Sequence, residues 1–65
     1  MSLLESFHTE PTRVLVALLR RDPMMSRREA EEAVGEPIRW FDWKKAHVVY
    51  YKSVGRDFDA WNAGQ

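Results

Sequence analysis

Histidine is the side chain best suited to acid–base or metal chemistry near neutral pH, and this sequence contains two. His8 and His47 stand far apart, and neither belongs to an HxxxH or HExxH pattern that would place two ligands on one helix face. His47 falls among apolar and aromatic residues, which predicts a packed histidine at the edge of the core, whereas His8 is expected in a solvated turn. Without cysteine, a thiolate zinc site and a disulfide framework are excluded. We predict no metal site and no cofactor.

Carboxylates and hydroxyls also fail to form a catalytic pattern. Glu29 with Glu32, or Asp57 with Asp59, could act as a pair, but the run Arg-Arg-Glu-Ala-Glu-Glu is typical of a solvated helix face with i, i+4 ion pairs. The serines have no accompanying His and Asp, and Ser26 stands where a helix cap is expected. The three glycines form neither a GxGxxG nor a GxxxxGK phosphate loop. The sequence therefore predicts a protein that is not an enzyme.

Composition limits the remaining classes of protein. The 65 residues, 45% hydrophobic and 31% charged, suit one small globular domain spanning residues 1–65. Ten basic and ten acidic residues cancel, whereas autonomous nucleic-acid binders usually carry a basic excess. The longest uncharged run, Val14 to Leu19, is too short to cross a membrane, and no signal peptide is expected at the start. These features, with the absence of cysteine, favour a cytoplasmic location.

Proline and glycine divide the chain into short helical segments. Ser2 and Glu5 have capping-box spacing for a short N-terminal turn that ends near His8. From Thr12 the apolar residues follow a helical stripe that ends at Arg20 and Arg21, before Asp22-Pro23. A second helix is announced by the capping box from Ser26 to Glu29, and Gly35 is expected to end it in a left-handed conformation.

The third segment admits two interpretations. Trp40, Trp43, His47, Tyr50 and Val54 share one helical face, with Asp42 as the cap of a helix beginning at Trp43 and Gly55 at its end. The β-branched and aromatic residues at positions 47–51 would also suit a strand, but no second strand is available to pair with it.

We therefore favour a helix for this segment, followed by a last turn that Asp57 caps and that runs through Phe58 and Trp61 to frayed residues 62–65. The predicted fold is all-α: a small three-helix domain with a short N-terminal turn and a loosely docked C-terminal tail.

Most of the aromatic residues lie from Trp40 to Trp61. We expect Phe41, Val48 and one tryptophan to fill the core against the first helix. A short helix cannot hide both of its sides in so small a domain, so one face is expected to remain exposed as an interaction surface. The residues predicted to bind a partner are Trp40, Trp43, Tyr50 and Trp61, with Arg39, Lys44 and Lys45 at the rim.

Two basic groups keep a nucleic-acid alternative open. Arg20, Arg21, Arg27 and Arg28 gather around the first turn between helices and could contact phosphate. Lys45, Lys52 and Arg56 share a helical face beside Lys44 and could contact phosphate or an acidic protein.

The segment Glu29–Gly35 looks somewhat like the second helix and turn of a helix-turn-helix motif, but Glu31 stands where a small residue is usual. The recognition helix would also present aromatic rings rather than Arg, Asn or Gln.

The sequence thus favours a small protein–protein interaction module, such as an adaptor, assembly factor or inhibitor. Its partner would be another protein or a second copy of itself, as a homodimer. A helix-turn-helix-like DNA-binding regulator is the alternative, and a membrane role is not favoured.

Overall fold

The computed structural model describes residues 3–64, and within that range it consists of helices and their connections without any strand. The helices are α1 (Leu3–Thr9), α2 (Pro11–Arg21), α3 (Arg27–Val34), α4 (Trp40–Val54) and α5 (Phe58–Ala63). The all-α prediction is confirmed, and positions 47–51 lie inside α4 rather than in a strand. None of the helices in the described range is long and apolar enough to cross a membrane.

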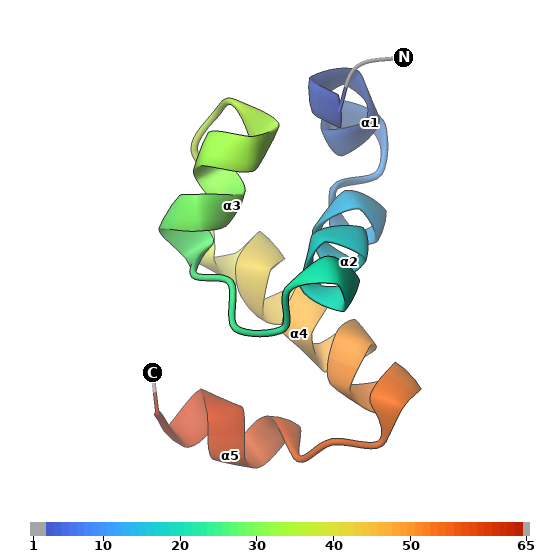
Figure 1. The fold of residues 1–65 in the computed structure, drawn as a ribbon, viewed down its shortest axis with the longest axis vertical. Coiled ribbons are helices and arrows are strands. Elements are labelled where there is room, and N and C mark those ends of the chain that lie inside the picture. Colours follow the sequence, from blue (N-terminus) through green and yellow to red (C-terminus); the bar gives the residue numbers. More distant parts are fainter. Residues whose placement is uncertain (1–2, 65) are drawn as a thin grey trace.

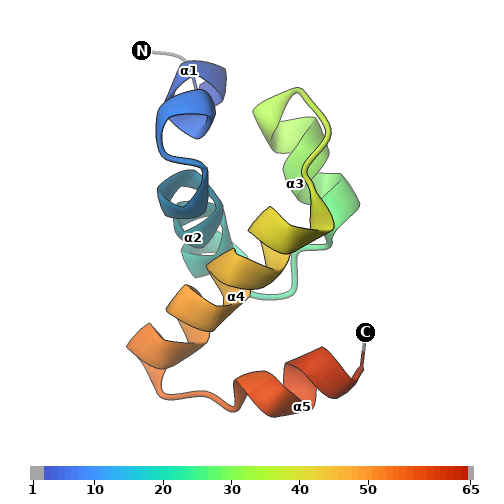
Figure 2. The same ribbon diagram turned by 180° about the vertical axis from the view of Figure 1, so that it is seen from behind.

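α4 is the longest helix and organises the others. It passes behind α2 and α3 in Figure 1 and lies in front of them in Figure 2. α2 packs on α4, α1 contacts both α2 and α3, and α5 turns back to contact α4. His8, at the end of α1, is exposed, and its Nε2 lies 2.6 Å from the Oε1 of Glu36, which follows α3.

α2 supplies the most deeply buried aliphatic side chains. Pro11 occupies its first position, where the missing N–H is not needed, and Arg20 and Arg21 lie in the last turn as predicted. Leu15 and Leu19 are fully buried and share one helix face, because they are four residues apart. They anchor a core that also includes Phe7, Val34, Ile38, Trp43 and Tyr50.

α3 forms where its local signals predict. The Ser26 hydroxyl accepts the Glu29 N–H at 3.1 Å, and the Glu29 carboxylate accepts the Ser26 N–H at 3.1 Å, so the capping box is complete. Gly35 ends the helix in the left-handed region with φ of 98°. The carboxylate of Glu31 then accepts the N–H of Ile38 at 2.7 Å, which ties α3 to the chain that leads into α4.

The start and the buried face of α4 differ from the prediction. The helix begins at Trp40 with Arg39 as its cap, and the Trp43 N–H already donates to the Arg39 carbonyl at 3.1 Å, so Asp42 lies inside the first turn and is not the cap. Phe41, predicted to lie in the core, is 72% exposed. The prediction failed because α2 packs against the α4 face that carries Trp43 and Tyr50, which leaves Phe41 on the opposite side.

The C-terminal segment folds back onto α4. The Asp57 carboxylate accepts the N–H groups of Asp59 and Ala60, which confirms the predicted cap. α5 continues through Ala63, so the prediction of fraying from position 62 is wrong for Asn62 and Ala63. Phe58 and Trp61 are half-buried and pack against the core. Ser2 and Gln65, which belong to the predicted terminal segments, lie outside the described residues.

Candidate interaction surface

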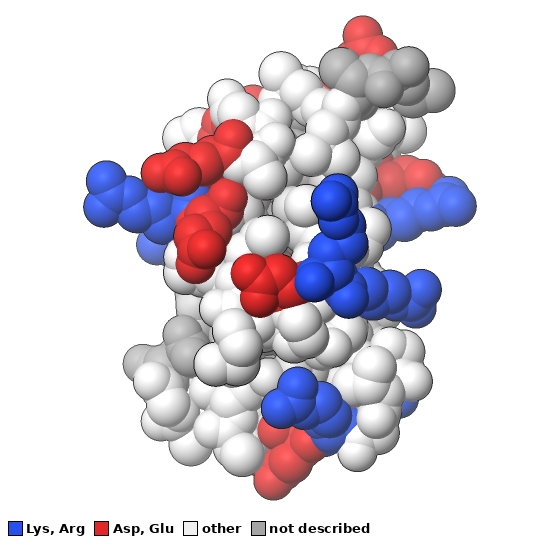
Figure 3. Space-filling view, in the orientation of Figure 1, with Lys and Arg blue, Asp and Glu red and all other residues white. Residues whose placement is uncertain are grey.

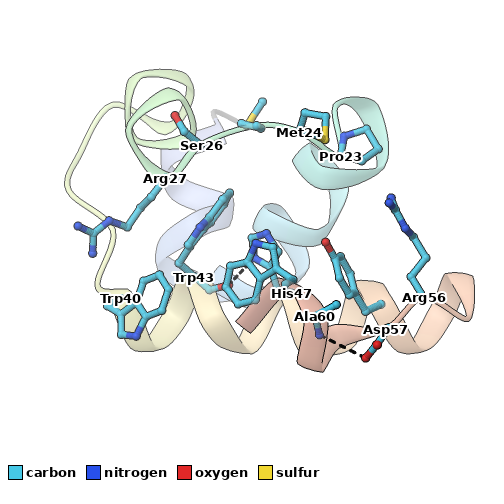
Figure 4. A pocket seen from close by; sticks show the side chains of 13 residues that line it. Pro23, Met24, Ser26, Arg27, Trp40, Trp43, His47, Arg56, Asp57 and Ala60 are labelled. Atoms are coloured by element: carbon cyan, nitrogen blue, oxygen red, sulfur yellow. Dashed lines mark hydrogen bonds between the residues drawn. The ribbon is translucent and has the colours of Figure 1, made fainter. Parts of the chain in front are cut away.

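The described surface contains a groove of about 890 Å³ with aromatic walls. One wall is the connection from Pro23 to Arg27, the floor is α4, and the other wall runs from Arg56 to Trp61. Figure 4 shows Trp40, Trp43 and His47 rising from α4 on one side, with Pro23, Met24 and Ser26 facing them. We call this feature the aromatic groove; its principal lining residues are Met24, Met25, Trp40, Trp43, His47, Tyr51 and Trp61.

The rings in the groove are packed on one another. Trp61 is stacked on His47, with ring centroids 3.9 Å apart and an interplanar angle of 14°, and on Trp40 at 5.8 Å and 19°. Trp43 meets the His47 ring edge to face at 4.6 Å. Stacked and edge-to-face pairs stabilise by about 0.5–1.5 kcal/mol each beyond their buried area. These ring contacts connect Trp61 of α5 to Trp40 and His47 of α4.

His47 is the one buried polar side chain of the described core, at 2% exposure. Its Nδ1 lies 3.0 Å from the carbonyl oxygen of Trp43, and because that oxygen can only accept, the neutral ring carries its proton on Nδ1. Burial lowers the pKa of His47 below the ordinary value of an imidazole, and the hydrogen bond to Trp43 opposes this shift. The prediction of a packed histidine is confirmed. Its neutral form suits a structural role in the aromatic stack.

Two cations lie at the edges of the groove, each over an aromatic ring. The Arg27 guanidinium carbon lies 6.0 Å from the Trp40 ring centroid, and that of Arg56 lies 5.6 Å from the Tyr51 ring centroid. Such contacts hold the guanidinium groups over the rings while leaving N–H donors for an acceptor. Asp57 also lines the groove, but its carboxylate is occupied by the cap of α5. The rim thus combines apolar side chains with two cations and the capping carboxylate of Asp57.

The structure brings together three of the four aromatic residues predicted to bind a partner. Trp40, Trp43 and Trp61 all line the aromatic groove. Tyr50 is 5% exposed and lies in the core instead, and Trp43 is 3% exposed, so it forms floor rather than edge. The prediction that the face carrying Trp43 and Tyr50 is exposed is therefore wrong, because this face of α4 packs on α2.

The predicted basic residues do not share one site. Arg39 caps α4, Lys44 is half-buried, and Lys45 is exposed on the same side of α4 as Phe41, away from the aromatic groove. Arg20, Arg21, Arg27 and Arg28 are all exposed. Of these, Arg27 lines the aromatic groove, whereas Arg20 lines a different groove along α2. Arg20 and Arg27 therefore line separate grooves.

Sequence reasoning missed several groove residues. Met24 is 85% exposed, the highest value among the large hydrophobic side chains described, and it projects from the connection between α2 and α3. Tyr51 follows Trp43 and His47 at four-residue steps, so continuing that spacing identifies the groove side of α4. The local sequence pattern does not predict that Met24 lies at a groove, because the opposite wall comes from α5, which is distant in sequence.

No group of three or more His, Asp or Glu side chains within residues 3–64 is arranged to hold a metal ion. No protein-family model matches the sequence, and neither the curated proteins nor the solved structures include one with significant similarity to it.

Proposed function

We propose that this domain is a non-enzymatic protein-interaction module, acting as an adaptor, assembly factor or inhibitor, that binds a segment of a partner protein in the aromatic groove. The observation that carries the proposal is the position of Met24 and Trp40, 85% and 41% exposed, at the edge of a groove floored by stacked rings. Full burial of a large apolar side chain contributes about 1.5–3 kcal/mol, and a partner would gain most of this from Met24 and the part that is still exposed from Trp40.

The residue types at the groove support this function. Trp, Tyr and Arg dominate the energetics of protein interfaces, and the groove combines Trp40 and Trp61 with Arg27 and Arg56. Met24 and Met25 add flexible, polarizable side chains that adapt to different apolar surfaces. A partner segment with a large apolar side chain would insert it between the methionines and the tryptophans, and its polar groups would reach the two arginines.

In this proposal the groove has a rigid floor and one wall that adjusts to the partner. We propose that α2, α3 and α4 act as a three-helix frame, since their buried residues form most of the core. α5 would be a loosely docked tail, because it has no fully buried residue and contributes only half-buried rings. The wall that carries Trp61 would then adjust to the bound segment.

The test is a capture from native lysate with the tagged domain, performed with and without nuclease and repeated with two variants. Met24→Glu places a charge at the groove edge, and Val54→Glu is the matched control, since Val54 is an exposed apolar residue of α4 outside the groove. The proposal expects a discrete protein that survives nuclease and the Val54 change but is lost with Met24→Glu.

Two results would contradict the proposal. If the captured protein is retained by Met24→Glu, the groove is not its binding site. If nucleic acid is recovered and the proteins disappear with nuclease, the domain is a helix-turn-helix-like DNA-binding protein, and Arg27→Ala with Arg28→Ala should then weaken DNA binding and flatten its salt dependence. Sedimentation of the purified domain shows whether it dimerises, and a dimer that Met24→Glu abolishes would place a second copy in the groove.

A further inference from the structure

α2 and α4 carry the same surface pattern at the same spacing. Arg13, Ala17 and Arg20 on α2 are at i, i+4 and i+7, and so are Lys45, Val49 and Lys52 on α4. Residues with this spacing share one face of a helix, so each helix presents an apolar side chain between two cations one turn away. All six side chains are exposed.

α2 and Val49 of α4 border one hollow. α2 packs on α4, and a groove of about 580 Å³ is lined by Glu10, Thr12, Arg13, Val16, Ala17 and Arg20 on the α2 side and by Val49 from α4. Lys45 and Lys52 flank Val49 along α4 but do not line the groove. We call it the α2–α4 groove. Val49 is 42% exposed, and Phe41, two turns earlier on the same side of α4, is 72% exposed, so the apolar strip continues beyond the groove. None of these residues lines the aromatic groove.

Charge is unevenly distributed although the chain is neutral overall. Of the four cations around the α2–α4 groove, only Arg13 lies in an ion pair among the described residues, with Glu10 at 3.2 Å. The acidic residues concentrate on α3, where Glu29, Glu31 and Glu32 follow one another closely. Figure 3 shows acidic side chains over α3 with basic side chains beside them, and further acidic side chains at the centre and the lower edge of this face. The α2–α4 groove therefore has an apolar centre, with the Arg13–Glu10 ion pair and Arg20 along its α2 side and the exposed Lys45 and Lys52 beside Val49 on α4.

We propose that the α2–α4 groove binds an amphipathic helix of a partner protein that carries carboxylates on both sides of an apolar side chain. The two cations on each helix are seven residues apart, which corresponds to about 10 Å along the axis. A partner helix with acidic residues at i and i+7 and an apolar residue between them has the complementary arrangement. Its apolar side chain would cover Ala17 and Val49, while its carboxylates would reach the cations.

Two other occupants fit less well. A nucleic-acid backbone would neutralise the cations but leave the strip of Ala17, Val49 and Phe41 in water. A second copy related by twofold symmetry would place the same patch on itself, because such an interface joins identical surfaces. Four cations would then face four cations.

The test selects 16-residue peptides from a random phage-displayed library on the wild-type domain. Binding of the enriched peptides is then measured by calorimetry, and the binding site is mapped by amide NMR shifts. We expect acidic residues flanking an apolar residue at helical spacing, with shifts centred on Ala17 and Val49. The double variant Arg20→Glu/Lys52→Glu should weaken binding about tenfold or more, as removal of charge complementarity does at other interfaces.

The matched control is Arg28→Glu/Arg39→Glu, which reverses two exposed cations that do not line the α2–α4 groove. This variant should bind within about twofold of the wild type. Circular dichroism checks the fold of both variants, and NMR mapping on the wild-type domain gives an answer even if one of them does not fold.

Several outcomes would overturn the inference. One is an enriched set without acidic bias, and another is unchanged binding to Arg20→Glu/Lys52→Glu. Peptides lost with Met24→Glu would place binding in the aromatic groove, which supports the proposed function while excluding the α2–α4 groove. A 20-base-pair duplex that binds more tightly than the best peptide, or a dimer that the double variant abolishes, would assign the groove to nucleic acid or to a second copy.

Discussion

Trp61 lies flat against His47, with the two ring centroids 3.9 Å apart, and this stack joins the C-terminal helix to the central one. It covers the only polar side chain buried in the described core. The same indole also stacks on Trp40 and lies near Tyr51 and Phe58. One half-buried residue of α5 thus determines both the wall of the aromatic groove and the environment of the imidazole beneath it.

Removing this ring should change the titration of His47. Trp61→Ala exposes the imidazole to water, so its lowered pKa should rise toward the ordinary value, because burial is the main cause of the shift. We also expect the free energy of unfolding to fall by about 1 kcal/mol or more, because both stacked pairs and the buried part of the indole are lost. An NMR titration of the imidazole protons and urea unfolding measure the two effects. Phe41→Ala serves as the control, and an unchanged pKa of His47 in Trp61→Ala would show that the indole does not shield it.

The stability of the domain should depend on pH near neutrality. The pKa of folded His47 is lowered by burial, whereas in the unfolded chain it is about 6.5. Above that value both states are neutral. As the pH falls below it, the unfolded state takes up a proton first, so stability is lost until the pH passes the lowered pKa of the folded state.

Urea midpoints measured between pH 7.5 and 5 should therefore decrease with acidity. The dependence of the urea midpoint on pH should remain in His8→Gln, because the His8 side chain is exposed. It should disappear in His47→Gln, which removes the buried imidazole. A midpoint that rises on acidification would show that His47 is not the group responsible.

The connection between α3 and α4 should depend on one carboxylate. Glu31 accepts the Ile38 N–H at 2.7 Å in a partly buried position, whereas its neighbour Glu32 is exposed. Glu31→Ala should lower the free energy of unfolding by about 1–3 kcal/mol, the range for hydrogen bonds to charged groups and for the unpaired donor left behind. Glu32→Ala should change it by less than about 0.5 kcal/mol. Thermal or urea unfolding of the two variants measures this difference. Equal losses of unfolding free energy in both variants would refute the role of Glu31.

Glycine is required at the end of α3 but not at the end of α5. Gly35 has φ of 98°, which side chains rarely adopt, whereas Gly64 has φ of −81° in the ordinary helical region. Gly35→Ala should destabilise the domain by about 1 kcal/mol or more despite open space around the added methyl group. Gly64→Ala should be close to neutral. Comparable losses in both variants would mean that backbone conformation is not the cause.

Features that depend on neighbours in the sequence were predictable. The capping box at Ser26, the left-handed Gly35 and the Asp57 cap all form where the sequence indicates, since each involves hydrogen bonds or dihedral angles within a few residues. The start of α4 was not predictable in this way. Asp42 is a good cap residue, but the extended backbone of Arg39 begins the helix three residues earlier.

The sequence by itself determined that the chain is helical, where most helices end, and that α4 has more apolar surface than the domain can bury. Only the tertiary structure decided which side of α4 is covered. Both of its sides carry rings, and helical periodicity does not distinguish Trp43 and Tyr50, which are buried, from Phe41, which is exposed. The choice depends on how α2 packs and on where α5 places Trp61, and these long-range contacts involve residues that no local pattern relates.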